Sequence, residues 1–147
     1  MPKNVTVTEA RDLQQSGHTY VDVRSTIEFS EGHPEGAMNV PLLEADPDFG
    51  QMQPNPDFVR VMQAAFPPDA KLLIGCQVGG RSLRAAQMLE TFGFTDVTNV
   101  KGGFGGARDP MGRVVAPGWS ESGLPVATED RPGTNYSALL ARADAAE

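Results

Sequence analysis

Residues 71–82 read Lys71-Leu-Leu-Ile-Gly-Cys76-Gln-Val-Gly-Gly-Arg81-Ser82, an apolar run that leads into a glycine-rich turn. The run Leu72–Ile74 has no polar alternation, which is typical of a central strand buried on both faces. A helix is predicted over Arg81–Phe92, because apolar residues recur there at helical spacing and Gly93 follows as a stop signal. A strand, a tight turn and a helix in this order predict an α/β domain whose functional groups lie at the carboxyl end of the strand.

Strand and helix patterns alternate along the rest of the chain, which favours a mostly parallel sheet. We expect strands near residues 5–7, 19–23, 37–40 and 97–100. We expect helices over residues 8–15, 26–29 and 56–66, the second of them capped by Ser25 or Thr26. Turns or loops are expected at residues 32–36, 44–56 and 105–116, which are rich in Gly, Pro and Asp.

The chain has 147 residues, which is close to the size of one domain. We expect residues 1–126 to form that domain. Residues 127–147 are polar and punctuated by Pro and Gly, then rich in Ala. They are predicted to be a C-terminal tail that either contains a short helix near residues 137–146 or is partly disordered.

A single cysteine excludes an intrachain disulfide and suits a reducing compartment. The first residues, Met1-Pro-Lys-Asn-Val, show no apolar region of the kind that a signal peptide needs. No apolar run approaches the roughly 18 residues of a membrane span. These features predict a cytoplasmic protein that does not act at a membrane.

The net charge of −7 argues against a nucleic-acid surface, because phosphate binding needs a basic face. The neighbourhood of Cys76 has the opposite sign. Between Asp69 and Glu90 the chain carries three cations, Lys71, Arg81 and Arg84, and no carboxylate. A local site for an anion is therefore compatible with an acidic protein.

Cys76 is a candidate nucleophile, but a lone cysteine that ends a buried strand is more often a small apolar core residue. A thiolate is the reactive form, and a free thiol, with a pKa of about 8.5, is mostly protonated at neutral pH. Gly79 and Gly80 allow backbone N–H groups to turn toward an anion, and the helix that begins near Arg81 adds the positive end of its dipole. This turn makes the reactive interpretation the better one. A Cys–His pair with His18 or His33 is less favoured.

Several segments in this order resemble the rhodanese-type sulfurtransferases. The stretch Cys76–Ser82 resembles their active-site loop. Four further segments resemble their other motifs: Asp22-Val-Arg24 with Glu28, Gly32-His33-Pro-Glu-Gly36-Ala37, Asn99-Val-Lys-Gly102-Gly103, and Trp119 to Pro125. Pro34 departs from the common isoleucine. The resemblance covers roughly residues 3–126 and implies a central, mostly parallel five-stranded sheet with helices on both faces.

The resemblance implies a role for each residue of the loop. Cys76 would accept a sulfane sulfur and become a persulfide. The backbone of Gln77, Val78, Gly79 and Gly80 would cradle that sulfur, and Arg81 would bind the anionic donor. Asp22, Arg24 and Ser82 would support the site, mostly structurally for Asp22 and Arg24. Glu28 is expected to pair with Arg24.

The implied reaction moves sulfur from thiosulfate, or a related donor such as 3-mercaptopyruvate, to cyanide or a thiol by double displacement. No cofactor or metal is implied, and His18, His33 and the carboxylates lack the spacing of metal ligands. A protein sulfur acceptor is a further possible partner. The oligomeric state is left open by the sequence.

Other functions compete with sulfur transfer. Cysteine phosphatases need five residues between the cysteine and the arginine to wrap a phosphate, whereas four lie between Cys76 and Arg81 here. An arsenate reductase is a slightly better alternative than a phosphatase. A sulfur carrier, or a non-enzymatic binding or regulatory module that acts on a protein partner, is also open. The intact Cys76 and Arg81 argue against an inactive module.

Overall fold

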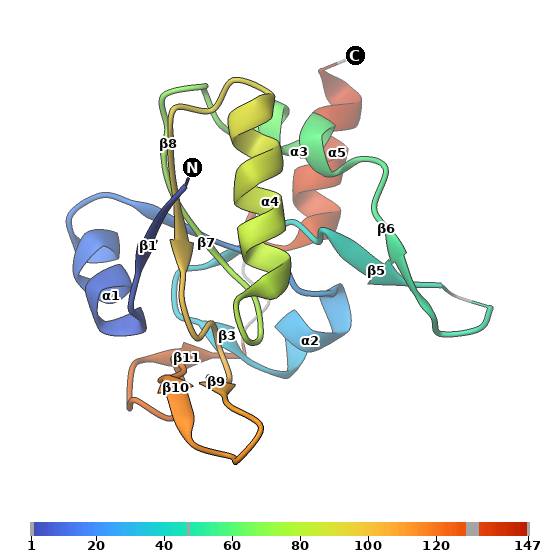
Figure 1. Ribbon diagram of the computed structural model, residues 1–147. Helices are drawn as coiled ribbons and strands as arrows, with labels where there is room; N and C mark the ends of the chain where they lie inside the picture. Colours follow the sequence, from blue (N-terminus) through green and yellow to red (C-terminus); the bar gives the residue numbers. More distant parts are fainter. Residues whose placement is uncertain (1, 47, 129–132, 147) are drawn as a thin grey trace.

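The computed structural model describes residues 2–46, 48–128 and 133–146 and has a parallel sheet at its centre (Figure 1). The sheet order is β1 (Lys3–Val5), β8 (Asp96–Val100), β7 (Lys71–Gly75), β2 (Thr19–Asp22) and β4 (Met38–Asn39). All four pairings are parallel. The helices within the described ranges are α1 (Val7–Gln15), α2 (Thr26–Glu31), α3 (Phe58–Ala65), α4 (Gly80–Thr91) and α5 (Tyr136–Ala145). The predicted five-stranded α/β fold is confirmed.

Two core clusters lie on the two faces of this sheet. Successive side chains of β7 point to opposite faces, so Leu72 and Ile74 join one cluster and Leu73 joins the other. Helices α3, α4 and α5 pack on the first cluster, and α1 packs on the second. The apolar run of β7 is thus buried on both faces as predicted, and each such side chain contributes about 1.5–3 kcal/mol of burial free energy.

Two helices begin at capping boxes. Thr6 Oγ1 accepts from the Glu9 N–H while Glu9 Oε1 accepts from the Thr6 N–H, and this pair starts α1 at Val7. The helix therefore begins before residue 8, and the strand predicted near residues 5–7 ends at Val5. Ser25 caps α2 in the same way with Glu28, which confirms the predicted start of that helix.

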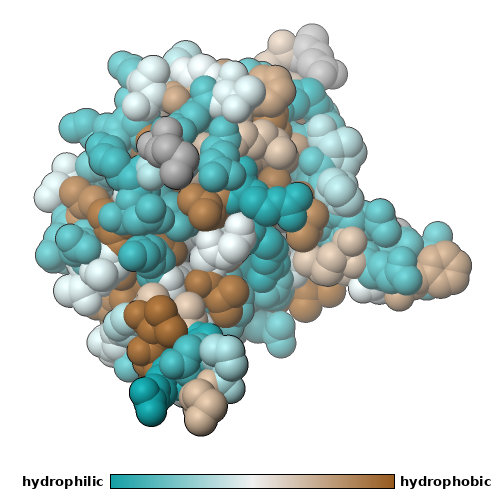
Figure 2. All heavy atoms as spheres, in the orientation of Figure 1, coloured by the Kyte–Doolittle hydropathy of each residue, from teal (hydrophilic) through white to brown (hydrophobic). Residues whose placement is uncertain are grey.

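Three small antiparallel ribbons are present, and all of their strands except β11 (Val126–Ala127) lie in or next to segments predicted to be turns or loops. The strands β5 (Leu43–Ala45) and β6 (Met52–Pro54) form a hairpin, and β9 (Ala107–Arg108) pairs with β10 (Val114–Ala116). A third ribbon joins β3 (His33–Pro34) to β11 (Val126–Ala127). Glycine, proline and aspartate marked these segments as loops, although the short strands beside their turns are paired. Figure 2 shows apolar atoms at the surface where β9 and β10 lie.

The C-terminal helix α5 belongs to the core. Leu139 and Ala143 are buried in the same cluster as the residues of α3 and α4, and α5 packs against α3. The short helix predicted within residues 127–147 is therefore present, but it is not part of a separate tail. Residues 129–132 of that segment lie outside the described residues. In the described ranges, no helix has the length and apolar character needed to cross a membrane.

Candidate active site

Cys76 follows the last residue of the central strand β7 and precedes α4 by a three-residue turn. Its side chain is 1% exposed. The strand β7 lies between β8 and β2, so the turn leaves the middle of the sheet at its carboxyl edge. This is where a parallel sheet places its ligands, and it is the position predicted for Cys76.

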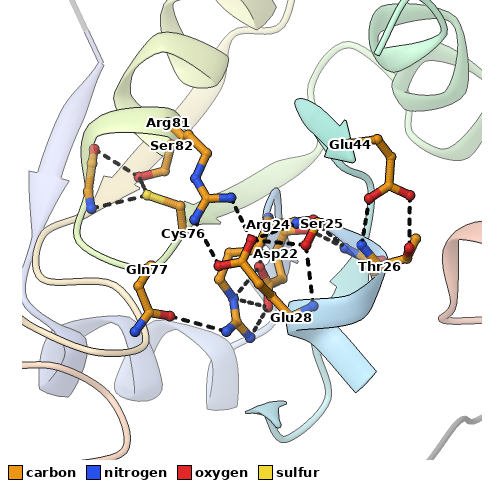
Figure 3. Close-up of polar contacts among 12 residues, drawn as sticks. Asp22, Arg24, Ser25, Thr26, Glu28, Glu44, Cys76, Gln77, Arg81 and Ser82 are labelled. Atoms are coloured by element: carbon orange, nitrogen blue, oxygen red, sulfur yellow. Dashed lines mark hydrogen bonds and ion pairs between the residues drawn. The ribbon is translucent and has the colours of Figure 1, made fainter. Parts of the chain in front are cut away.

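The sulfur of Cys76 lies at the amino end of α4. The Gly79 N–H donates to Sγ at 3.1 Å, and the thiol lies 3.4 Å from Ser82 Oγ (Figure 3). Gly79 has a φ of +122°, which favours glycine and which turns its N–H toward the sulfur. The hydrogen bond from the Gly79 N–H and the positive end of the helix dipole both favour negative charge on Sγ.

Ser82 connects Cys76 to two asparagines at the same sheet edge. Ser82 Oγ lies 2.6 Å from Asn99 Oδ1 and 3.1 Å from the carbonyl oxygen of Gly79. Asn99 Nδ2 donates in turn to Asn4 Oδ1 at 2.9 Å. Sequence reasoning assigned no role to either asparagine. The sequence feature that could have identified them is a polar residue near the carboxyl end of a parallel strand. Asn4 and Asn99 are direct register partners across β1 and β8.

The backbone of the segment from Gly103 to Gly105 holds the turn after Cys76 in place. The Phe104 N–H donates to the Cys76 carbonyl at 2.7 Å, and the Gly105 N–H donates to the Gln77 carbonyl at 2.9 Å. A Cβ atom on Gly103 would lie 2.1 Å from the Cys76 carbonyl oxygen. Glycine is therefore required here, because any side chain would push the Cys76 backbone away from this segment.

Replacing Gly103 by alanine is expected to destabilise the fold by more than the about 1–2 kcal/mol that a left-handed non-glycine residue costs. The backbone φ is +54°, and the added methyl group also collides with the Cys76 carbonyl. Gly112→Ala is the matched control, because Gly112 has a φ of +83° and open space around it. Urea unfolding of both variants measures the difference. Equal losses of stability would contradict the role given to the close approach.

Asp22 and Arg24 form a buried ion pair beside the turn. Arg24 Nη2 lies 2.8 Å from Asp22 Oδ2, and the two side chains are 3% and 1% exposed. Arg24 Nε also donates to the same carboxylate, and Nη2 donates to the Gly32 carbonyl. The pair therefore ties the end of β2 to the end of α2.

Arg24 also lines a cavity beside the Cys76 turn, which we call the mouth of the site. Its Nη1 donates to Gln77 Oε1 at 3.3 Å, and its guanidinium lies 4.4 Å from the centre of the Phe104 ring. A cavity of about 340 Å³ opens at this place. It is lined by Arg24, Glu28, Glu31, Gly32, Gln77 and Phe104.

Arg81 extends from the start of α4 toward α2, where it meets Glu28 (Figure 3). Nη1 donates to Oε1 at 2.7 Å and Nη2 donates to Oε2 at 3.0 Å, so the contact is bidentate. The expectation that Glu28 pairs with Arg24 is therefore wrong. Arg24 pairs with Asp22, which lies two residues before it, and Glu28 pairs with Arg81.

The ion pair perturbs both of its members. The hydrogen bond from Arg81 lowers the pKa of Glu28 to about 2, and the bond to Glu28 raises the pKa of Arg81. Because the folded pKa of Glu28 lies below the unfolded value, the stabilisation from this pair is present above about pH 4 and is lost as the pH falls toward 2. The pair is thus intact across the neutral range.

The remaining candidates lie around the turn or away from it. Val78 is 54% exposed at the tip of the turn, and Gly80 is the first residue of α4. His33 stacks on Phe29 with ring centroids 3.6 Å apart, and its Nδ1 lies 2.7 Å from the Phe29 carbonyl oxygen. Among the described residues, no group of three or more His, Cys, Asp or Glu side chains is arranged to hold a metal ion.

Comparisons with known proteins agree with this geometry. The family model of the rhodanese-like domain matches residues 6–108. Thiosulfate sulfurtransferase 16, a chloroplastic protein of Arabidopsis thaliana, is 38% identical over 85% of this chain and 92% of its own length. Thiosulfate sulfurtransferase 18 of the same plant is 35% identical over 90% of this chain and 89% of its own. The crystal structure of Rv0390 from M. tuberculosis has a TM-score of 0.70 and 26% identity, covering 86% of this chain and 98% of that one.

Proposed function

This chain belongs to the rhodanese-like family, and from that premise we propose that it transfers sulfane sulfur through a persulfide on Cys76. Thiosulfate is the proposed donor, because two of the relatives that match most of the chain are named thiosulfate sulfurtransferases. Cyanide or a thiol is the proposed acceptor. The observation that carries the proposal is the Gly79 N–H aimed at Cys76 Sγ at the amino end of α4.

The proposed reaction has two displacements. The Cys76 thiolate attacks the outer sulfur of thiosulfate, the S–S bond of the donor breaks, and sulfite leaves with the electron pair. The enzyme then holds a persulfide anion. Cyanide attacks the terminal sulfur, thiocyanate leaves, and the Cys76 thiolate is restored. Charge balances in each step without an external oxidant or reductant.

The chain offers groups that suit this chemistry. The Gly79 N–H and the amino end of α4 favour the thiolate before attack and the persulfide anion after it. Arg81 is the proposed binding group for the sulfonate end of the donor. Ser82, held by Asn99, is proposed to keep the Cys76 side chain in position. The burial of Cys76 would shield the persulfide from bulk solvent.

Intact mass after incubation with thiosulfate tests this function. The expected result is a gain of one sulfur atom, which cyanide removes. Alkylation of the protein before incubation should prevent the gain, because Cys76 is the only cysteine in the chain. Absence of any gain would overturn the proposal and favour a binding or regulatory module.

A sulfur carrier that receives its persulfide from a protein donor is the alternative. Loading by a cysteine desulfurase in the absence of loading by thiosulfate would favour this carrier. The same mass measurement separates the two, because only the source of the sulfur differs.

A further inference from the structure

The contact between Glu28 and Arg81 occupies the group that an anionic donor needs. Glu28 Oε1 and Oε2 take the two terminal nitrogens of the guanidinium at 2.7 and 3.0 Å. A sulfonate prefers the same bidentate approach to an arginine. A donor that used this edge of Arg81 would compete with a carboxylate that is already tethered next to it.

The charges at the mouth of the site do not favour a doubly charged ligand. Arg24 lines the cavity and is paired with Asp22, and Glu28 of the same lining is paired with Arg81, so both guanidinium groups are neutralised by carboxylates. Glu31 adds a third carboxylate to the lining of the cavity. The described charged groups that line this mouth, with their ion-pair partners, therefore carry one negative charge in excess. The thiolate of Cys76 adds another when it forms.

We propose that Glu28 is an internal competitor for Arg81 and thereby sets the discrimination between doubly and singly charged sulfur donors. This inference rests on the proposed function, in which Arg81 binds the donor. A dianion such as thiosulfate must displace or share the Glu28 carboxylate, whereas a monoanionic thiosulfonate meets less repulsion from it. Glu28 is a positioning residue that acts through Arg81, since it makes no described contact with Cys76.

A second set of hydrogen bonds, at the start of α2, holds the Glu28 side chain in place. Glu28 also closes the capping box of α2, where Oε1 accepts from the Ser25 N–H at 3.2 Å and the Ser25 hydroxyl at 3.0 Å. The carboxylate is thus held by the helix start as well as by Arg81. Glutamine can close the same box, so Glu28→Gln removes the charge while it keeps the helix cap.

The test measures binding of inorganic sulfate and of methanesulfonate at constant ionic strength, followed by NMR shifts of the Gly79 and Arg81 amides. In Glu28→Gln, sulfate is expected to bind about tenfold more tightly and methanesulfonate about threefold more tightly. Glu31→Gln is the matched control, because it removes the same charge from the same cavity without releasing Arg81. Its expected gain for sulfate is below about twofold.

Further variants and transfer kinetics decide the outcome. In Glu28→Gln combined with Arg81→Gln, the gain in sulfate affinity should disappear. The KM for thiosulfate should fall in Glu28→Gln more than the KM for methanethiosulfonate. Unchanged or weaker sulfate binding in Glu28→Gln, or an equal gain in Glu31→Gln, would overturn the inference. Sulfate does not react with Cys76, so this binding result stands even if thiosulfate fails to load the protein.

Discussion

Replacing Cys76 by serine is expected to lower thiosulfate:cyanide sulfur transfer by about a thousandfold or more. A serine hydroxyl is a poor nucleophile at neutral pH and forms no persulfide. Cys76 is the only cysteine in the chain, so no neighbouring thiol can replace it. The measurement is thiocyanate formation together with intact mass after thiosulfate treatment.

The anion-binding part of the site should survive this substitution. The Gly79 N–H belongs to the backbone, and Arg81 lies in α4, so the substitution at Cys76 alters neither group. Cys76→Ser is therefore expected to keep its sulfate affinity within about threefold while its transfer activity is lost. This control separates loss of the nucleophile from loss of the fold. Retention of full transfer activity in Cys76→Ser would rule out the persulfide mechanism.

Short-range patterns were enough to predict the centre of the fold and the cysteine turn. The apolar run Leu72–Ile74 is typical of a strand buried on both faces, and it does lie in the middle of the sheet; the next residues contain both the turn and the helix start. The sulfur position follows, because a strand, a turn and a helix of these lengths leave little freedom. The Gly79 N–H contact with Cys76 Sγ is a consequence of that local geometry.

The charge arrangement at the mouth could not be predicted in the same way. Glu28 lies four residues after Arg24 in sequence, which is a favourable spacing within one helix, but Arg24 precedes α2 and turns back to Asp22. Arg81, which lies 53 positions away along the chain, takes the place of Arg24 as the partner of Glu28. Which arginine pairs with which carboxylate depends on how α2 and α4 pack, and no local pattern encodes that packing.

The docking of α5 was missed for a related reason. Its sequence, Tyr136 to Ala145, has only a weak division between apolar and polar faces, so it was predicted as part of a tail. The helix is nevertheless buried at Leu139 and Ala143, because α3 offers an apolar surface beside the sheet. Long-range packing decided the outcome where the local signal was weak.

Replacing Arg24 by methionine is expected to lower the free energy of unfolding by about 3–5 kcal/mol. Methionine fills much of the space of the arginine stem, but it leaves the Asp22 carboxylate buried without its cation. The carbonyl of Gly32 also loses a donor. Urea denaturation measures the loss, with Arg108→Met as the control. The Arg108 ion pair with Glu121 is exposed, so its removal should cost less than about 1 kcal/mol.

A double-mutant cycle shows whether that cost comes from the unpaired carboxylate. Adding Asp22→Asn to Arg24→Met removes the buried charge, and part of the lost stability should return. In Arg24→Met, the transfer activity per folded molecule should fall by less than about a hundredfold, because Arg24 contacts the turn through a hydrogen bond to Gln77 at 3.3 Å. A loss as large as that of Cys76→Ser would contradict the structural role and make Arg24 part of the chemistry. An Arg24→Met variant as stable as Arg108→Met would show instead that the buried pair contributes little to the fold.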